Sequence, residues 1–219
     1  LDYLSRVLMG PEKPFIAILG GAKVSDKIGV IKNLLPKLDA LLVGGGMAYT
    51  FLKADGISIG RSLVEKDKIS VAKELMSDAM AHSVKVLLPT DHLTGDGNKE
   101  NSSISNVNIP EGRIGLDIGP RTTHRFIEEI GRSKMVLWNG PVGLFEMEPF
   151  DRGSRALAQA LADHRPNVIS IVAGGDTVAA VNAAGVADHI THLSTGGGAT
   201  LEFLEGRELP GIKALEKKA

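Results

Sequence analysis

The sequence predicts a three-layer α/β fold, in which a parallel sheet of about six strands lies between two layers of helices. Two observations carry this prediction. Short apolar runs, typical of strands buried on both faces, alternate along the chain with longer segments of helical periodicity. Glycine clusters follow several of these runs, at the points where a strand would give way to a tight turn. We therefore expect one α/β domain.

The expected strands are short and continuously apolar. Runs of this kind fit strands that helices cover on both sides. Open α/β sheets bind ligands beyond the carboxyl ends of their strands, so the glycine turns that follow are candidate ligand loops. The expected strands span residues 15–19, 40–43, 85–89, 134–138, 168–172 and 189–193.

The segments between these runs have helical periodicity, and residues 1–8 also resemble an amphipathic helix. Segment 93–108 breaks the alternation, because it is rich in Asn, Ser, Gly and Asp; we expect a long surface loop or a hairpin insertion there. Asp91 would lie just past a strand end, and residues 213–219 would form a frayed basic tail. The expected helices span residues 27–35, 48–54, 66–82, 120–131, 151–163, 177–184 and 199–206.

Composition limits the classes of function. The 219 residues are 43% apolar and carry a formal net charge of −1, as in an ordinary globular domain. This charge does not mark a nucleic-acid or membrane surface, and no apolar stretch is long enough to span a bilayer. The lack of cysteine excludes disulfides and thiolate chemistry and fits a reducing compartment. The chain opens on Leu1 rather than methionine, so we expect a fragment or a processed chain.

The most informative motif is the glycine turn after the first expected strand. Gly20 and Gly21 let the backbone approach a ligand closely, and the following helix offers unpaired N–H groups and the positive end of its dipole. Lys23 and Lys27, four residues apart, would project from one face of that helix. Two cations at such a helix start indicate a polyphosphate ligand. The spacing is not that of a Walker A loop.

A second glycine turn, Gly174-Gly175, precedes Asp176 and Thr177 at the start of another expected helix. Taken alone, this pattern favours capping, in which Asp or Thr accepts hydrogen bonds from the first free N–H groups. The functional alternative is a carboxylate ligand for Mg²⁺ beside N–H groups that bind phosphate. Mg²⁺ takes one or two carboxylates and completes its shell with phosphate oxygens and water.

A third turn, at residues 194–199, contains three consecutive glycines. It is either a flexible turn that permits close packing of strand and helix, or a second cradle of backbone N–H groups for an anion. Two such turns after successive expected strands favour phosphates that lie between them.

The segment after the expected strand at 134–138 carries side chains suited to a nucleoside. Pro141, Val142 and Leu144 would form an apolar wall against a purine, and Glu146 could accept hydrogen bonds from ribose hydroxyls. The glycines at 44–46 remove side chains where a flat base could enter. Each of these features, taken singly, also has a plain explanation as a turn or as core.

Other motifs point to no chemistry. The six histidines are scattered without metal-ligand spacing, and no G-x-S-x-G nucleophile motif occurs. We interpret the histidines as structural or surface groups. Arg121 and Arg125 share a helix face, which we interpret as a solvated face.

These motifs gain specificity from their order along the chain, which is Gly20 to Lys27, Gly44 to Ala48, Leu116 to Pro120, Trp138 to Glu146, Gly174 to Thr177 and Ser194 to Ala199. In this order and spelling they closely resemble the C-terminal, nucleotide-binding half of phosphoglycerate kinase. The resemblance runs from the opening helix to Leu209-Pro210-Gly211, which is essentially the whole chain.

The resemblance implies a Rossmann-like fold with an interdomain helix at residues 1–12 and a nucleotide-binding C-terminal domain at 13–219. The family transfers a phosphoryl group reversibly between 1,3-bisphosphoglycerate and ADP in glycolysis, giving 3-phosphoglycerate and Mg·ATP. Its N-terminal domain binds the phosphoglycerate and carries an arginine that stabilises the phosphoryl group in flight. We expect that domain to be absent from this chain. The chain would therefore bind Mg-nucleotide but be inactive alone, and the parent enzyme would be a cytoplasmic monomer.

The resemblance also assigns roles to side chains. Lys23 would contact the transferring phosphate, and Lys27 the α-phosphate. Asp176 would hold Mg²⁺, Asn139 would lie beside the phosphate chain, and Glu146 would bind the ribose. The expected adenine pocket consists of Gly21, Gly45, Leu63, Gly115, Leu116, Pro141 and Leu144, and the nucleotide-binding stretches also include Gly46, Gly143 and Gly174.

Backbone groups complete the site that the resemblance implies. Thr177 with Gly175 would hold nucleotide phosphates, and the N–H groups of Gly196, Gly197 and Gly198 would reach the transferred phosphate after domain closure. Phosphoryl transfer depends on positioning and on neutralisation of charge, so a missing nucleophile motif is expected.

One position departs from the family pattern, and two other functions stay open. Ala173 stands where the family usually has a further glycine; if that position needs a positive φ, the alanine costs about 1 kcal/mol. One alternative is a nucleotide-binding module without catalysis. The presence of Lys23 and Asp176 argues against it. The other is a dinucleotide-dependent enzyme, against which G-x-G-x-x-G is missing after the first expected strand.

Overall fold

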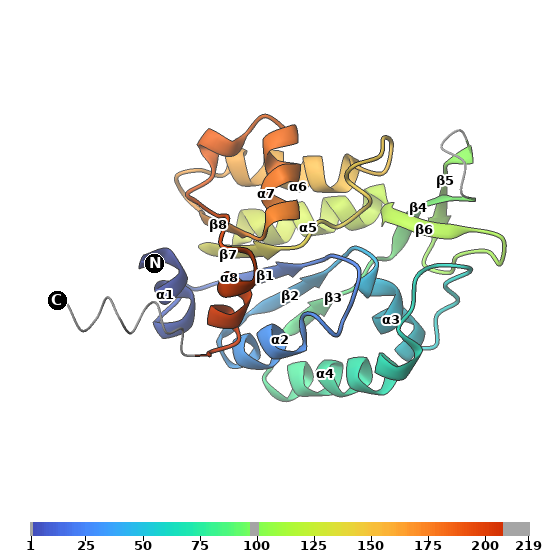
Figure 1. Cartoon of the computed structure of the whole chain (residues 1–219), viewed down its shortest axis with the longest axis horizontal. Coiled ribbons are helices and arrows are strands. Elements are labelled where there is room, and N and C mark those ends of the chain that lie inside the picture. The colour runs from blue at the N-terminus through green and yellow to red at the C-terminus, as the bar shows by residue number, and fades with distance from the viewer. Residues whose placement is uncertain (1, 97–100, 208–219) are drawn as a thin grey trace.

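The central sheet of the computed structural model is parallel and six-stranded, as predicted, with the strand order β3-β2-β1-β7-β8-β9 (Figure 1). The structure describes residues 2–96 and 101–207. The six strands are β1 (Phe15–Leu19), β2 (Ala40–Val43), β3 (Lys85–Leu87), β7 (Met135–Asn139), β8 (Ile169–Ala173) and β9 (His192–Ser194).

Strand β1 shows why the apolar runs are continuous. Phe15, Ala17 and Leu19 pack into one core cluster, whereas Ile16 and Ile18 pack into a second cluster on the opposite face of the sheet. All five are at most 2% exposed. Because successive side chains of a strand point to opposite faces, both faces of this strand need apolar residues.

Helices cover both faces of the sheet, which confirms the three-layer prediction (Figure 1). None of the helices within residues 2–96 and 101–207 has the length and apolar character needed to cross a membrane. One core cluster joins the sheet to α1 (Asp2–Met9), α2 (Ile28–Leu34), α3 (Met47–Ala54), α4 (Ile69–Ala81) and α8 (Gly197–Leu204), and the other joins it to α5 (Pro120–Arg132), α6 (Arg152–Asp163) and α7 (Gly175–Ala183).

A second, antiparallel sheet of order β5-β4-β6 lies at one end of the molecule (Figure 1). It contains β4 (Asp91–Gly95), β5 (Ser103–Asn106) and β6 (Ile114–Ile118). Of the two expectations for segment 93–108, the hairpin insertion is correct, because β4 and β5 pair with each other. The sequence did not predict β6. Gly115 and Asp117 interrupt its apolar run, and its pairing with β4 comes from residues distant in the chain.

Several predicted boundaries shift by a few residues. The last strand is β9 instead of 189–193, because its pairing with β8 begins at Ile171 and His192 and a 3-10 turn, Ala187–His189, precedes it. Helices α7 and α8 begin two residues earlier than predicted, since their first turns include glycines that we had assigned to the preceding loops. The expected segment 66–82 splits into a 3-10 turn, Lys66–Lys68, and α4. The expected basic tail at 213–219 lies outside the described residues.

The strand order brings the glycine motifs together. In a parallel sheet all carboxyl ends lie at one edge, so the turns after β2, β1, β7, β8 and β9 form a row in that order. These turns contain residues 44–46, 20–21, 140, 174–175 and 196–198, respectively. Motifs that are far apart in the sequence therefore share one edge of the sheet.

Candidate functional site

Backbone hydrogen bonds tie three of these turns into one surface. The N–H of Gly21 donates to the carbonyl oxygen of Pro141 at 2.9 Å, and the N–H of Gly45 donates to that of Val142 at 3.0 Å. The N–H of Met47 in turn donates to the carbonyl oxygen of Gly21 at 3.0 Å. Because the polar groups of each turn are satisfied by the next, the turns after β2, β1 and β7 hold one another in place.

This close approach of backbones requires glycine. A Cβ atom at Gly20 would lie 2.1 Å from the carbonyl oxygen of Pro141. Gly45 has a φ of 67°, in the left-handed region, and a Cβ atom there would lie 2.7 Å from both the nitrogen and the oxygen of Gly21. A side chain at either position would force the turns apart.

A cleft of about 280 Å³ opens beside the linked turns. Its walls come from β6, α3 and the loop that follows β7. The predicted nucleotide-site residues that line it are Gly21, Gly45, Gly46, Leu63, Gly115, Leu116, Pro141, Gly143, Leu144, Glu146 and Asp176. The sequence analysis missed four further lining residues, which are Ala22, Tyr49, Ile114 and Phe145.

Tyr49 shows why some lining residues escape sequence analysis. It lies within α3, where the apolar pattern predicts core packing, and it is only 4% exposed. A Cβ atom at Gly115 would lie 2.2 Å from its hydroxyl oxygen, so Gly115 makes room for the ring. Burial and the nearby charge of Asp117 raise the pKa of the Tyr49 hydroxyl, which stays protonated at neutral pH.

The cleft combines exposed apolar side chains with one acid. Leu63 and Leu144 are 51% and 38% exposed, and both line the cleft, where they form an apolar surface. Glu146 is exposed and, within the described part of the chain, forms no hydrogen bond or ion pair. The apolar surface suits the face of a flat ring, and the carboxylate beside it can accept hydrogen bonds from hydroxyl groups.

Lys27 lies deeper and is held by Asn139. Its Nζ atom donates a hydrogen bond to Oδ1 of Asn139, whose Nδ2 donates to the carbonyl oxygen of Ala173 at 2.8 Å. The lysine is 7% exposed, and burial lowers its pKa. The negative charges of Asp26 and Asp176 raise that pKa, but by less than burial lowers it. The structure thus places a buried cation between the end of β1 and the ends of β7 and β8.

The start of α7 does not use the capping that Asp176 and Thr177 suggested. The N-cap is Gly174, at φ 96°, and no side chain caps this helix. The Thr177 hydroxyl oxygen instead accepts a hydrogen bond from the N–H of Gly140 at 2.7 Å. Asp176 is exposed in the first turn and has no hydrogen-bond partner among the residues that the structure describes. Its carboxylate is therefore free for a ligand.

The departure at Ala173 carries no backbone strain. Among residues 2–96 and 101–207, Ser83 is the one non-glycine residue with a positive φ. The left-handed conformation of the turn falls on Gly174, so an alanine before it is tolerated.

Several predicted phosphate contacts lie outside the cleft lining. Lys23 is exposed, between the first turn and α2. Gly196, Gly197 and Gly198 follow β9 at the edge of the sheet, and the N–H of Gly174 donates to the carbonyl oxygen of Ser194 at 3.2 Å. Lys27, Asn139, Gly174, Gly175 and Thr177 lie between these two places, at the ends of β7 and β8. The predicted phosphate residues thus continue along the sheet edge from the cleft.

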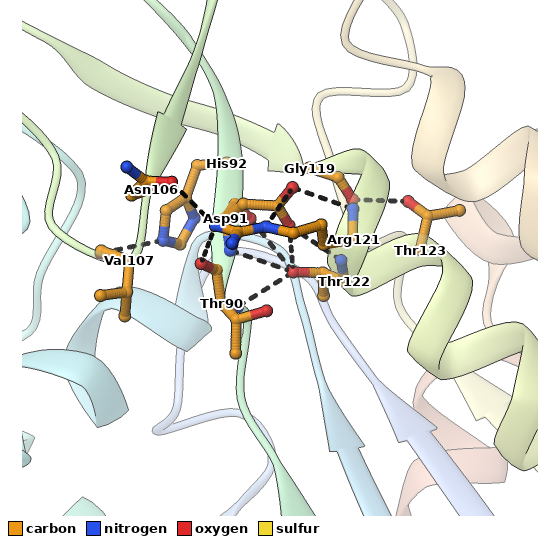
Figure 2. A network of polar contacts seen from close by, with 9 residues as sticks. All are labelled: Thr90, Asp91, His92, Asn106, Val107, Gly119, Arg121, Thr122 and Thr123. Carbon is orange, nitrogen blue, oxygen red and sulfur yellow. Dashed lines mark hydrogen bonds and ion pairs between the residues drawn. The ribbon is translucent and has the colours of Figure 1, made fainter.

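Asp91 has a structural use. It follows β3, as expected, but it also begins β4, is 1% exposed and directs its carboxylate at the first turn of α5 (Figure 2). Its oxygens accept hydrogen bonds from the N–H groups of Arg121 and Thr122 at 2.9 and 2.8 Å and from the Thr122 hydroxyl at 2.6 Å. The carboxylate is satisfied by these donors and does not reach the cleft.

The described part of the chain has no ready-made metal cage, since no group of three or more His, Cys, Asp or Glu side chains there could hold an ion. The exposed carboxylate of Asp176, at the row of turns along the sheet edge, fits a different arrangement. A Mg²⁺ ion can take one carboxylate there and obtain its other ligands from phosphate oxygens and water.

Fold and cleft together define a three-layer α/β protein with a glycine-lined ligand site at the carboxyl ends of parallel strands. The sequence model of the phosphoglycerate kinase family matches residues 1–207, and the chain belongs to this family.

Relatives and solved structures agree with this assignment. The chain is 54% identical to a phosphoglycerate kinase of Koribacter versatilis and 54% identical to one of Clostridium novyi, covering 100% of this chain and 55% of each relative. The solved phosphoglycerate kinase of Coxiella burnetii superimposes with a TM-score of 0.94 at 43% identity, over 100% of this chain and 56% of that one. The solved phosphoglycerate kinase of Pyrococcus horikoshii superimposes with a TM-score of 0.83 at 31% identity, over 98% of this chain and 55% of that one. The chain therefore spans about half the length of the curated relatives it matches.

Proposed function

We propose that this chain is the nucleotide-binding half of a phosphoglycerate kinase. The whole enzyme would transfer a phosphoryl group reversibly between 1,3-bisphosphoglycerate and ADP, giving 3-phosphoglycerate and ATP in glycolysis. In this proposal residues 1–12 form the interdomain helix and 13–219 the nucleotide domain. The observation that carries it is the cleft, whose lining contains the residues that the family motifs assign to adenine and ribose.

The nucleoside would occupy the cleft. Its adenine ring would lie against Leu63 and Leu144, on the backbone of the glycine turns that line the cleft. The Glu146 carboxylate would accept hydrogen bonds from the ribose hydroxyls. Exposed apolar surface in the free protein supports this arrangement, because a bound ring would cover it.

The phosphate chain would run along the sheet edge toward β8 and β9. Lys27, positioned by Asn139, would neutralise the α-phosphate, and Lys23 would contact the phosphate that moves. The backbone of the Gly175 turn and of residues 196–198 would supply N–H donors. The row of turns supports this direction, because it leads from the cleft to these groups without a break in the sheet.

Mg²⁺ at Asp176, when bound, would neutralise charge on the phosphate oxygens and fix the geometry of the nucleotide's phosphate groups. Lys23 and Lys27 would act on the same charge from the protein side. No proton needs to be removed by the protein, because the carboxylate or acyl-phosphate oxygen is already a competent partner for transfer.

The half-enzyme would bind nucleotide without turning it over. The substrate 3-phosphoglycerate would be held by the other half of the enzyme, whose approach would also exclude water from the transfer site. We expect no turnover of ATP and 3-phosphoglycerate by this chain alone in a coupled assay. Substantial turnover would contradict the proposed division of labour.

The ribose contact provides a sharp test of the nucleotide site. Glu146→Gln should weaken ADP binding about tenfold in calorimetric titration, because a charged hydrogen bond contributes about 1.5–3 kcal/mol. The matched control is Glu148→Gln, which changes an exposed acid two residues further on that does not line the cleft.

The ligand can be varied in the same titration. With 2′,3′-dideoxy-ADP, which lacks the ribose hydroxyls, Glu146→Gln and the unaltered chain should bind equally well. A loss for Glu146→Gln that persists with the dideoxy ligand would show that Glu146 does not bind the ribose. Equal ADP affinity of all three proteins would contradict the proposed site.

A further inference from the structure

A second cavity, remote from the nucleotide cleft, lies between the three-stranded sheet and helices α5 and α6. Its volume is about 350 Å³, which falls in the usual range for small-molecule sites. It shares no lining residue with the cleft described above. It is lined by Leu93, Ile104, Ile118, Pro120, Thr123, His124, Ile127, Arg152 and Ala156.

The walls of this cavity are aliphatic. Leu93 of β4 and Ile104 of β5 are opposite each other in the ladder, and Ile127 of α5 faces the same space. Ile104 is 63% exposed, although it is a large apolar residue on a strand. No Phe, Tyr or Trp side chain lines the cavity within the described part of the chain. Branched aliphatic walls of this kind fit a flexible hydrocarbon chain.

Arg152 supplies a positive charge at the same cavity. It forms no hydrogen bond or ion pair with any residue that the structure describes. Two acids of α5 and the start of α6 have other partners: Asp151 pairs with Arg155 at 2.7 Å, and Glu128 lies 3.4 Å from His124. Asp117, which interacts electrostatically with Arg152, is buried, and its carboxylate accepts hydrogen bonds from backbone N–H groups. The Arg152 guanidinium is therefore available to an anion.

The surroundings add to the positive charge. A neighbouring hollow of about 660 Å³ shares Pro120 and His124 with this cavity and is also lined by Arg121 and Arg125. The Arg121 side chain is held by Asp91 and by Asn106, whose Oδ1 accepts from it at 2.8 Å (Figure 2). Arg125 has no acidic partner among residues 2–96 and 101–207. The helix face that the sequence indicated as solvated thus borders an apolar cavity.

We propose that this cavity binds a small aliphatic carboxylate. The hydrocarbon chain would lie among Leu93, Ile104 and Ile127, and the carboxylate would pair with Arg152, whose planar fork can donate two hydrogen bonds to it. The site would be independent of the nucleotide, because the two cavities share no residue.

The test is calorimetric titration of the 219-residue chain with decanoate below its micelle concentration, and with decanol as a neutral ligand of the same chain length. Decanoate should bind saturably and about tenfold more tightly than decanol. Arg152→Gln should remove that preference, and its decanol affinity should stay unchanged. The matched control, Arg155→Gln, lies one turn further along α6 outside the cavity and should keep the preference.

A second variant tests the apolar wall. Ile104→Asp places a charge at an exposed position, so the fold is preserved while decanoate and decanol should both lose affinity at least about tenfold. Saturating ADP should leave decanoate binding unchanged. The proposal is overturned if decanoate does not bind, if ADP displaces it, or if Arg152→Gln and Ile104→Asp bind it as the unaltered chain does.

Discussion

At the scale of single residues, the chemistry depends on polar groups that lack a partner in the protein. Asp176 and Glu146 are exposed carboxylates without hydrogen bonds to other described residues, whereas Asp91 and Asp117 are buried and bonded to backbone N–H groups. Burial raises the pKa of Asp117 well above its usual value, against the lowering effect of those bonds. Free acids at the sheet edge can serve a ligand, and the buried ones serve the fold.

Asp176 allows a direct test of the metal contact. Asp176→Ala should weaken ADP binding strongly when Mg²⁺ is present and little when it is absent, because the carboxylate would act through the ion. Calorimetric titration in both conditions measures the difference. Equal losses with and without Mg²⁺ would contradict a metal role for Asp176.

His92 makes folding stability depend on pH. Burial lowers its pKa to about 4, from 6.5, despite a hydrogen-bonding distance of 3.2 Å between Nε2 and the Val107 carbonyl oxygen (Figure 2). Between these two values the unfolded chain binds the proton and the folded chain does not, so stability falls as the pH drops from about 6.5 to about 4. The full loss from this group is on the order of 3 kcal/mol.

Urea unfolding at pH 7 and pH 4.5 isolates this effect. The difference in unfolding free energy between the two pH values should be smaller for His92→Gln than for the unaltered chain, because the variant lacks the group that titrates. His82→Gln, which changes an exposed histidine, is the control and should behave as the unaltered chain does. The same pH dependence in all three proteins would exclude His92 as the cause.

At the scale of elements, the first N–H groups of helix α5 are capped by the side chain of Asp91, which belongs to strand β4. Asp91→Ala should lower the free energy of unfolding by about 2–3 kcal/mol, because it leaves two helix N–H groups without their acceptor and removes the 2.6 Å hydrogen bond from the Thr122 hydroxyl. The control is Asp151→Ala at the start of α6, where the acid caps nothing and pairs with an exposed arginine. It should cost less than about 1 kcal/mol. Equal losses in urea denaturation would contradict the capping role.

The turns of the cleft predict a similar contrast between two glycines. Gly45 and Gly56 both have a positive φ, of 67° and 78°, but a Cβ atom at Gly56 would meet nothing within 4 Å. Gly56→Ala should therefore cost only the backbone strain, about 1 kcal/mol. Gly45→Ala should cost at least about 2 kcal/mol and also weaken ADP binding, since it pushes the first turn away. Similar stability and affinity of the two variants would show that the turns are not in tight contact.

Elements differed in how far the sequence predicted them. Strands β1 and β2 have the predicted bounds, because burial on both faces leaves an unmistakable apolar run. Strand β6 could not be predicted, since its glycine is explained by the ring of Tyr49 and its acid by the first turn of α6, whose Gly153 N–H donates to Asp117. The first turns of α7 and α8 were placed in loops, because glycine indicates a turn more strongly than a helix.

At the scale of the whole molecule, motif order indicated which residues share one cleft better than any motif alone did. The predicted adenine and ribose residues all line one cleft, because a parallel sheet gathers its strand ends at one edge. Tyr49, Ile114 and Phe145 were missed, since they are apolar or aromatic residues whose position relative to the cleft follows from packing alone. The aliphatic cavity beside Arg152 could not be predicted from the sequence either, because its lining comes from five elements, β4, β5, β6, α5 and α6.

The most direct test of the proposed function is calorimetric titration of the folded 219-residue chain with ADP, in the presence and absence of Mg²⁺. The cleft and the free carboxylate at Asp176 predict saturable binding that Mg²⁺ alters. Absence of ADP binding by a chain shown to be folded, or binding that Mg²⁺ leaves unchanged, would contradict a Mg-nucleotide site in this half of the enzyme.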